Sequence, residues 1–525
     1  MDSSLKTEPH WMRMLVFIML GGTVLRVIAA VSNGTFWFDE IITASIAQKP
    51  LALMWQYLRV ENHPPLHYFI IHAWMVLFGT GEAAVKLSSV FAGALGIGVT
   101  GIFARRLFGA HAGLVAAGVA ALSTFQIFFS AEARMYPWLY LFGLISLLSF
   151  WELFAPAPRR TWYWIWGCST LAALYTHLGG VFTLFIEAGF ALFLRARVWF
   201  RAHQGGEEGG AWPYLPLKRV FLITGLQVLL WLPWLVVFVR EKMQTFNRNA
   251  WYFWIEPANP FPMEALRQFF FFDNVSDFLE LCGWIFVLII LITTLLQLRR
   301  EGRGCLVRFD IDAPTAYATI TFIVPIVAGI LANVSVMKVY IIAGAGLYAL
   351  AGKGLSRLRI PAPIPSFLLP LLLTVFFFAS AMGVLFEVRP AWKEVGAYLA
   401  AREDQTDAIV IISHSYEVAL RYYYKGTTPV VPFYPLPDDT HGDSLLRAVR
   451  RNWYTLITKD NVDTLGSLVE GKKKIFVVLV GNFNKVERIA PEWFFSHGWQ
   501  LRSIKRWEDY MVNPEVMLLE KYSVK

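Results

Sequence analysis

Apolar segments long enough to cross a membrane recur through the first 387 residues, and they constrain the fold more than any other feature of the chain. A membrane-spanning helix needs roughly 20 predominantly apolar residues. With 56% hydrophobic and 16% charged residues, the 525-residue chain is too apolar for a soluble enzyme. We predict a polytopic α-helical membrane protein with about eleven transmembrane helices, at 12–31, 84–104, 112–132, 137–154, 162–178, 180–195, 219–239, 278–298, 315–334, 339–354 and 363–385.

Basic residues cluster between alternate apolar segments, around 105–106, 159–160, 195–201, 218–219, 299–303 and 353–359. All these clusters lie on one side of the membrane if the segment 65–79, about 15 residues long, lies along the membrane surface instead of crossing it. Positive charge marks the cytoplasmic side. We therefore expect an integral protein of the bacterial plasma (inner) membrane, with a cytoplasmic amino terminus and an extracytoplasmic carboxyl terminus. Since the net charge of +9 resides in these topological clusters, we expect no nucleic-acid partner.

From residue 388 the apolar runs shorten to strand length, as in AIVII at 408–412 and KIFVVLV at 474–480. They alternate with amphipathic stretches, which is typical of an α/β module. We predict two domains: a transmembrane domain at 1–387 and an extracytoplasmic soluble α/β domain at 388–525. By its position, the second domain is expected to cover the site or to help choose the acceptor.

Two carboxylates, Asp39 and Glu40, follow the first predicted span in the motif TFWFDE. A carboxylate beside aromatic rings at a membrane interface is partly desolvated, which raises its basicity and suits a general base. His63 and Tyr68 follow in NHPPLHY, where two prolines stiffen the chain. An ordinary solvated carboxylate pair and a structural histidine are the alternatives for these two motifs.

Further polar residues lie at the outer ends of later spans. They are Glu132, Arg134 and Tyr136 in AEARMY, His177 in LYTHLGG, and Lys338 with Tyr340 in SVMKVY. Ionisable residues in or beside spans tend to face a protein interior or a water-filled cavity. The alternatives are an ion pair that closes a helix hairpin, a buried hydrogen-bonded histidine and a snorkelling lysine. Because all of them map to one membrane face, we predict an outward-facing site in which they bind substrate together with His63 and Tyr68.

At these residues the sequence resembles the GT-C glycosyltransferases, in the branch that contains protein O-mannosyltransferases and the bacterial transferase that adds aminoarabinose to lipid A. The similar motifs follow one another over about the first 180 residues: WFDE at 37–40, HPPLHY at 63–68, LFGTGEAAVKLSS at 77–89, ARRLFG at 104–109, SAEARMY at 130–136 and YTHLGG at 175–180. The resemblance implies a GT-C-like fold, with Asp39 as the catalytic base and Glu40 as its neighbour.

Two positions depart from the aminoarabinose transferase. His63 stands where that enzyme has a lysine directed at the lipid phosphate, and Asn62 stands where it has an acidic residue that helps to hold a metal. We therefore do not transfer the metal site to this chain. No cofactor is assigned, and a divalent metal is left open.

The resulting hypothesis is a membrane glycosyltransferase that moves a sugar from a polyprenyl-phosphate donor to an acceptor hydroxyl on the extracytoplasmic side, with inversion and with Asp39 as general base. The expected partners are the lipid donor, membrane lipid, and a protein, glycolipid or glycan acceptor. One alternative is a flippase or transporter for polyprenyl-linked glycolipids, for which broken helices, related halves and mid-bilayer charges are expected. The other is a membrane-anchored binding or sensing protein whose functional part is 388–525.

Overall fold

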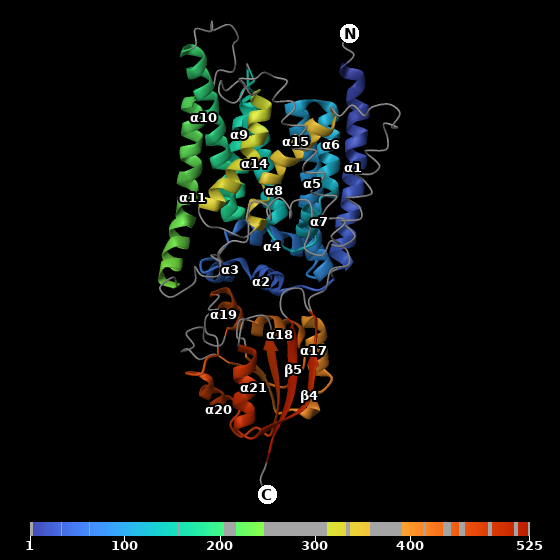
Figure 1. Ribbon diagram of the computed structural model, residues 1–525, viewed down its shortest axis with the longest axis vertical. Helices are drawn as coiled ribbons and strands as arrows, with labels where there is room; N and C mark the ends of the chain where they lie inside the picture. Colours follow the sequence, from blue (N-terminus) through green and yellow to red (C-terminus); the bar gives the residue numbers. More distant parts are fainter. Residues whose placement is uncertain are drawn as a thin grey trace.

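The chain folds into a helical bundle with a five-stranded sheet at one end, as the computed structural model shows in Figure 1. The structure describes residues 4–32, 34–61, 63–155, 157–203, 217–245, 312–331, 337–356, 391–412, 416–433, 443–450, 457–480, 486–508 and 513–522. The predicted spans at 278–298 and 363–385, the domain boundary at 387/388 and Asn62 lie outside these residues.

The described bundle consists of α1 (Ser4–Ser32), α5 (Glu82–Phe108), α6 (Ala110–Leu122), α7 (Thr124–Ser130), α8 (Tyr136–Glu152), α9 (Arg160–Thr176), α10 (Val181–His203), α11 (Leu217–Thr245), α14 (Ala313–Leu331) and α15 (Ala343–Ser356). Each predicted span that falls on described residues coincides with one of these helices or with the pair α6 and α7. Among the described helices, five are long and apolar enough to cross a membrane, or six if that bent pair counts as one span. Helices α8 and α9 have 17 residues each and α15 has 14, so length alone does not make them spans.

Short helices lie at the end of the bundle that faces the sheet. They are α2 (Phe38–Ala47), α3 (Leu51–Leu58), α4 (Leu66–Phe78), and the 3₁₀ turns η1 (Leu178–Gly180) and η3 (Met337–Tyr340). With 13 residues α4 is too short to cross a bilayer, as expected for the segment 65–79. Its last residues, Val76, Leu77 and Phe78, are more than half exposed, which suits a helix that lies in a membrane surface.

Basic residues gather at the other end of the bundle. Arg106 Nε lies 3.1 Å from Glu152 Oε1, which joins the ends of α5 and α8, and Lys353 Nζ lies 3.2 Å from Asp312 Oδ2. The Arg105 guanidinium stacks over the Trp11 ring near the start of α1, at 4.2 Å. The bundle therefore has a basic end and an end that faces the sheet.

Helices α6 and α7 form a broken span, with a bend of 57° between them. A break in a helix frees carbonyl groups that need donors. Arg26 of α1, which is 1% exposed, supplies them: its guanidinium donates to the carbonyl oxygens of Ala120 and Ala121 at 2.9 Å each, and its Nε donates to Ser130 Oγ at 3.2 Å. The sequence did not predict a broken helix, but the Arg26 charge on α1 completes the bundle's own hydrogen bonding at the break and so gives the transporter alternative no support.

The strands are β1 (Ala408–Ile411), β2 (Val430–Pro432), β3 (Lys474–Val480), β4 (Trp499–Arg506) and β5 (Pro514–Lys521), in the order β2-β1-β3-β5-β4. Strands β1, β2 and β3 are parallel, and β5 is antiparallel to β3 and β4. The strands expected at 408–412 and 474–480 are β1 and β3. Around them lie α17 (Trp392–Ala400), η4 (Glu403–Gln405), α18 (Glu417–Tyr423), α19 (Ser444–Arg450), η6 (Val462–Thr464), α20 (Leu465–Leu468) and α21 (Val486–Ser496). The sheet with these helices is called the sheet module below.

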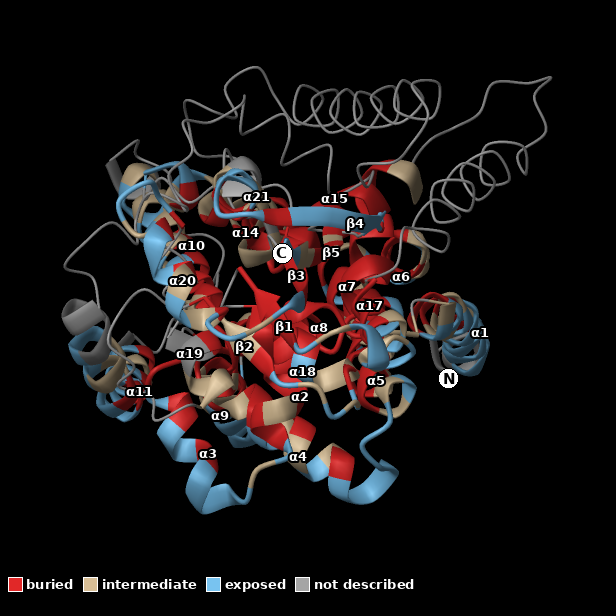
Figure 2. Ribbon diagram, turned by 90° about the horizontal axis from the view of Figure 1, so that it is seen from below, coloured by how far each residue is buried: buried red, intermediate tan, exposed pale blue. Residues whose placement is uncertain are grey.

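Alternate residues of β1 and β3 pack on opposite faces of the sheet, as the period of a strand requires. Val410 and Val477 pack on one face in a core of the sheet module itself. On the other face, Ile409 and Phe476 belong to a core that continues into α2, α3 and α4 and includes Phe36. Figure 2 shows the central strands buried and the edge strand β4 exposed. One hydrophobic core thus joins the sheet module to the segment that carries TFWFDE.

Candidate active site

The two carboxylates of TFWFDE lie in the first turn of α2, which begins directly after Trp37. Acidic residues there interact favourably with the unpaired N–H groups and the positive end of the helix. Glu40 also forms half of a capping box, since its Oε2 accepts the backbone N–H of Trp37 at 3.0 Å. The sequence therefore fixes the helix start locally, and neighbouring elements decide which carboxylate does what.

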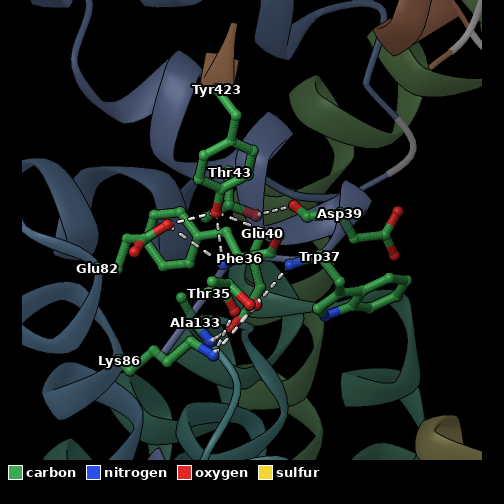
Figure 3. A network of polar contacts seen from close by, with 10 residues as sticks. All are labelled: Thr35, Phe36, Trp37, Asp39, Glu40, Thr43, Glu82, Lys86, Ala133 and Tyr423. Atoms are coloured by element: carbon green, nitrogen blue, oxygen red, sulfur yellow. Dashed lines mark hydrogen bonds and ion pairs between the residues drawn. The ribbon is translucent and has the colours of Figure 1, made fainter. Parts of the chain in front are cut away.

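Glu40 is fully buried, and both of its carboxylate oxygens have partners (Figure 3). Oε1 accepts the backbone N–H of Ala133 at 2.6 Å, and Oε2 lies 3.5 Å from Nζ of Lys86. Burial raises the pKa of Glu40, while Lys86 and the two backbone N–H groups oppose this rise. Lys86 also donates to the carbonyl oxygen of Thr35 at 3.0 Å. Glu40 thus connects α2 to α5 and to the loop after α7.

Asp39 points its carboxylate away from that network, as Figure 3 shows, and faces Arg134. Its Oδ2 lies 3.4 Å from Arg134 Nη2. Nη1 of the same guanidinium donates to the Asp39 carbonyl oxygen at 3.1 Å and to Thr43 Oγ1 at 2.8 Å. Burial alone would lower the pKa of Arg134, but the charge of Asp39 raises it above its ordinary value. The Asp39 carboxylate is therefore held beside a fixed positive charge.

Arg134, Tyr136 and Lys338 form a second group of donors beside Asp39. The Lys338 ammonium lies over the rings of Trp37 and Tyr136, 5.6 and 5.4 Å from their centroids, and the Arg134 guanidinium lies 6.0 Å from the Tyr136 ring. Within the described part of the chain, Arg134 Nε and Nη2 and the Tyr136 hydroxyl are buried without a hydrogen-bond partner. Buried donors of this kind are costly unless a ligand or water satisfies them. Such a cluster suits an anion with several acceptor oxygens.

Two histidines, His63 and His177, border this group. The His63 and His177 rings stack at 5.1 Å, and the Tyr136 ring meets His177 edge-on at 5.7 Å. Burial, and then the charges of Arg134 and Lys338, lower the pKa of His177 to about 3. Burial and the charge of Arg134 do the same for His67 of α4. His67 and His177 therefore add no positive charge near Asp39.

Glu132 lies in the loop between α7 and α8 and is 8% exposed. Burial, and then the negative charge of Glu40, raise its pKa to about 8. The charges of Lys338, Arg134 and Lys86 act in the opposite direction. At neutral pH this carboxyl group is therefore largely protonated, so it adds little negative charge to the cationic group.

The structure brings together most of the residues selected from the sequence: Asp39, Glu40, His63, Glu132, Arg134, Tyr136, His177 and Lys338. Tyr68 is fully buried on α4. Tyr340 stacks on Phe182 at 5.6 Å in the bundle core, on a different side of η3 from the contacts of Lys338.

Sequence reasoning missed several residues that the site uses: Thr43, Glu61, His67 and Lys86. Lys86 left a signal, because it is the one cation in the first half of the apolar helix α5 and such residues normally have a partner. Among the described residues, no group of three or more His, Cys, Asp or Glu side chains could hold a metal ion.

Residues 62–237 match the family model of dolichyl-phosphate-mannose-protein mannosyltransferase. These residues include α4 to α10, Arg134, Tyr136 and His177, while Asp39 and Lys338 lie outside the matched range. No curated protein matches the chain.

Solved structures resemble the whole chain at low sequence identity. ArnT from Cupriavidus metallidurans bound to undecaprenyl phosphate has a TM-score of 0.59 and 17% identity, over 97% of this chain and 98% of that chain. The apo state of the same protein has a TM-score of 0.58 and 16% identity, over 98% of each chain. The archaeal oligosaccharyltransferase AglB from Archaeoglobus fulgidus, in complex with an inhibitory peptide and a dolichol-phosphate, gives 0.50 and 13%, over 90% of this chain and 70% of that chain.

ArnT and AglB are both members of the GT-C superfamily. The structural likeness establishes the fold, and the family model supports the enzyme class. The resemblance predicted from the ordered motifs is thereby confirmed: this chain has the GT-C fold and is a glycosyltransferase.

Proposed function

We propose that the protein transfers a sugar from a polyprenyl-phosphate donor to an acceptor hydroxyl, with inversion at the anomeric carbon and with Asp39 as general base. The observation that carries this proposal is the position of the Asp39 carboxylate directly beside the donors of Arg134, Tyr136 and Lys338. A carboxylate can take a proton, and the adjacent donors can hold a phosphate. Undecaprenyl phosphate in ArnT and dolichol-phosphate in AglB support a lipid phosphate as ligand here.

The proposed reaction is a single displacement. Asp39 accepts the proton of the acceptor hydroxyl while the hydroxyl oxygen attacks the anomeric carbon. The bond between that carbon and the phosphate oxygen breaks, and the phosphate keeps the electron pair. Arg134, Lys338 and the Tyr136 hydroxyl stabilise the negative charge that develops on the leaving phosphate, in a buried site where such interactions are stronger than in water.

The site is proposed to face the extracytoplasmic side, together with the sheet module and the carboxyl terminus. Support comes from the basic residues at the opposite end of the bundle, where Arg105, Arg106 and Lys353 lie. Sugar nucleotides are made in the cytoplasm, so an outward-facing site needs a donor that a lipid carries across the membrane. The acceptor is a protein, a glycolipid or a glycan.

The test is Asp39→Asn in the purified full-length protein with a synthetic polyprenyl-phosphate sugar. Asparagine keeps the shape of the side chain but takes no proton, so we expect transfer to fall on the order of 10² to 10⁴-fold. Donor binding should stay near normal, because Arg134 and Lys338 remain. Full activity of this variant would remove Asp39 as the base. The transporter alternative would be favoured if the wild-type protein transfers no sugar and Asp39→Asn abolishes movement of the lipid across the membrane.

A further inference from the structure

Tyr423, the last residue of α18, reaches from the sheet module to the segment that leads into Asp39. The backbone N–H of Phe36 donates to its hydroxyl oxygen at 2.7 Å, and the hydroxyl donates to Oε1 of Glu82, the first residue of α5. Figure 3 shows this hydroxyl next to the Glu82 carboxylate and the backbone of Phe36. One phenol thus links α18, α5 and the chain just before α2.

Aromatic residues of the sheet module contact the same segment on both sides of Trp37. The Phe36 ring lies 6.1 Å from Tyr422, and the Phe38 ring lies 4.7 Å from Tyr416. Tyr416 in turn stacks on Trp392 of α17 at 5.5 Å. The sheet module therefore holds the residues that determine where α2 begins.

Charge strengthens the contact of Tyr423. Glu82 Oε2 lies 3.6 Å from Lys393 Nζ of α17, so the carboxylate is held between a helix of the sheet module and the phenol. A hydrogen bond to an ionised carboxylate is roughly twice as strong as one between neutral groups. Phe36 is itself fully buried, and its N–H precedes the first turn of α2, so the hydroxyl also satisfies a backbone donor.

The position of this contact gives it a consequence for chemistry. Phe36 lies three residues before Asp39, and α2 has only 10 residues, so a shift of Phe36 displaces the start of the helix and the carboxylate with it. A displacement of about 1 Å at a reacting group can lower a rate roughly 10²-fold. From the bundle, Lys86 of α5 holds the same segment at Thr35, and within the segment Glu40 binds the N–H of Trp37. The sheet module supplies the remaining support.

We infer that Tyr423 is a positioning residue for the base, so that the sheet module is part of the catalytic apparatus and not a separable acceptor-binding unit. The inference rests on the proposed role of Asp39. Tyr423 touches no substrate in this scheme. It acts through Phe36 and Glu82, and it sets the direction from which Asp39 meets the acceptor hydroxyl.

The first experiment compares Tyr423→Phe with Tyr424→Phe in the full-length protein. Both changes remove a hydroxyl that donates to a glutamate, but Tyr424 donates to Glu403 within the sheet module. We expect Tyr423→Phe to lower kcat about 10- to 100-fold, with the KM for the lipid donor changed less than about twofold. The control variant should keep the wild-type kcat. Wild-type kcat in Tyr423→Phe, or an equal loss in the control, would overturn the inference.

The second experiment repeats Tyr423→Phe in the Asp39→Asn background. If Tyr423 acts by placing the base, its loss should change the residual rate less than about twofold, because no base remains to be placed. A further loss as large as in the wild-type background would show a general structural effect and contradict the inference. Full activity of Asp39→Asn alone would instead refute the proposed function, so the two failures are distinguishable. Should Tyr423→Phe fold poorly, Glu82→Gln disrupts the other side of the contact and carries the same expectations.

Discussion

Replacement of Glu40 by glutamine should mainly lower the stability of the folded protein, because Glu40 is bound on both oxygens by the protein itself. The side-chain amide can accept at only one end, so one of the backbone N–H groups of Trp37 and Ala133, now 3.0 and 2.6 Å from carboxylate oxygens, loses its acceptor. A buried unsatisfied donor costs about 1–3 kcal/mol. Lys86, 2% exposed, also loses its charge partner, and breaking a buried ion pair costs about 3–5 kcal/mol.

The two costs overlap, because Lys86 keeps its bond to Thr35, so we expect a total of about 3–5 kcal/mol. A chain of this size shifts its unfolding midpoint by roughly 1 °C for each kcal/mol. Glu40→Gln should therefore unfold about 3–5 °C below the wild type in detergent, followed by tryptophan fluorescence. A matched control is Glu520→Gln, which breaks the exposed pair with Arg502 and should leave the unfolding midpoint close to that of the wild type.

A second change separates the structural from the catalytic reading of Glu40. In Glu40→Gln with Lys86→Met the uncompensated charge is gone, so much of the lost stability should return. An unfolding midpoint of Glu40→Gln within 1 °C of the wild type would refute the reasoning, whatever the activity. A stable but inactive Glu40→Gln would return Glu40 to the list of groups that act on the substrate.

The remaining predictions concern the phosphate and the pH dependence. Arg134→Ala and Lys338→Ala should each raise the KM for the lipid donor about 10-fold or more while membrane insertion stays normal. Arg134→Lys should not restore the KM, because an ammonium lacks the planar fork of donors. Unchanged donor kinetics in both alanine variants would make these residues structural. Because burial and the charge of Glu40 raise the pKa of Glu132 to about 8, Glu132 becomes negative as the pH rises through that value and repels the phosphate. Donor KM, measured from about pH 7 to 9, should therefore rise in the wild type and stay level in Glu132→Gln; the same rise in both proteins would assign the effect to another group.

Membrane helices could be predicted because the signal is local. A run of apolar residues with charges at its ends specifies a span without reference to the rest of the chain. The break between α6 and α7 could not be predicted in this way, since it is stabilised by Arg26, about 95 residues away along the chain. The short helices α8, α9 and α15 show the limit of length as a criterion, because a helix inside a bundle can be surrounded by protein.

The carboxylate pair of the candidate site could also be predicted to lie with the cationic residues, but the different surroundings of its two members could not. Asp39 and Glu40 are adjacent, and on a helix neighbouring side chains point in directions about 100° apart. Which of them meets Arg134 and which meets Ala133 depends on the loop after α7, 93 residues further along the chain. In the fold, the Asp39 carboxylate faces Arg134, whereas both carboxylate oxygens of Glu40 are bound by other parts of the protein. The motif WFDE does not contain this distinction.

The contact of Tyr423 with Glu82 is the part of the site that sequence reasoning had least means to find. The two residues are 341 positions apart, and although Glu82 lies in the motif LFGTGEAAVKLSS, nothing in that motif points to Tyr423. A phenol at the end of an amphipathic helix predicts only partial burial, and a glutamate at the first position of α5 predicts only a favourable helix start. Their meeting depends on the hydrophobic core that Phe36 and Phe38 share with the face of the sheet that carries Phe476. Because this core is continuous, the sheet module has no freedom to tilt without moving the start of α2, and the geometry of the proposed base depends on how it is seated.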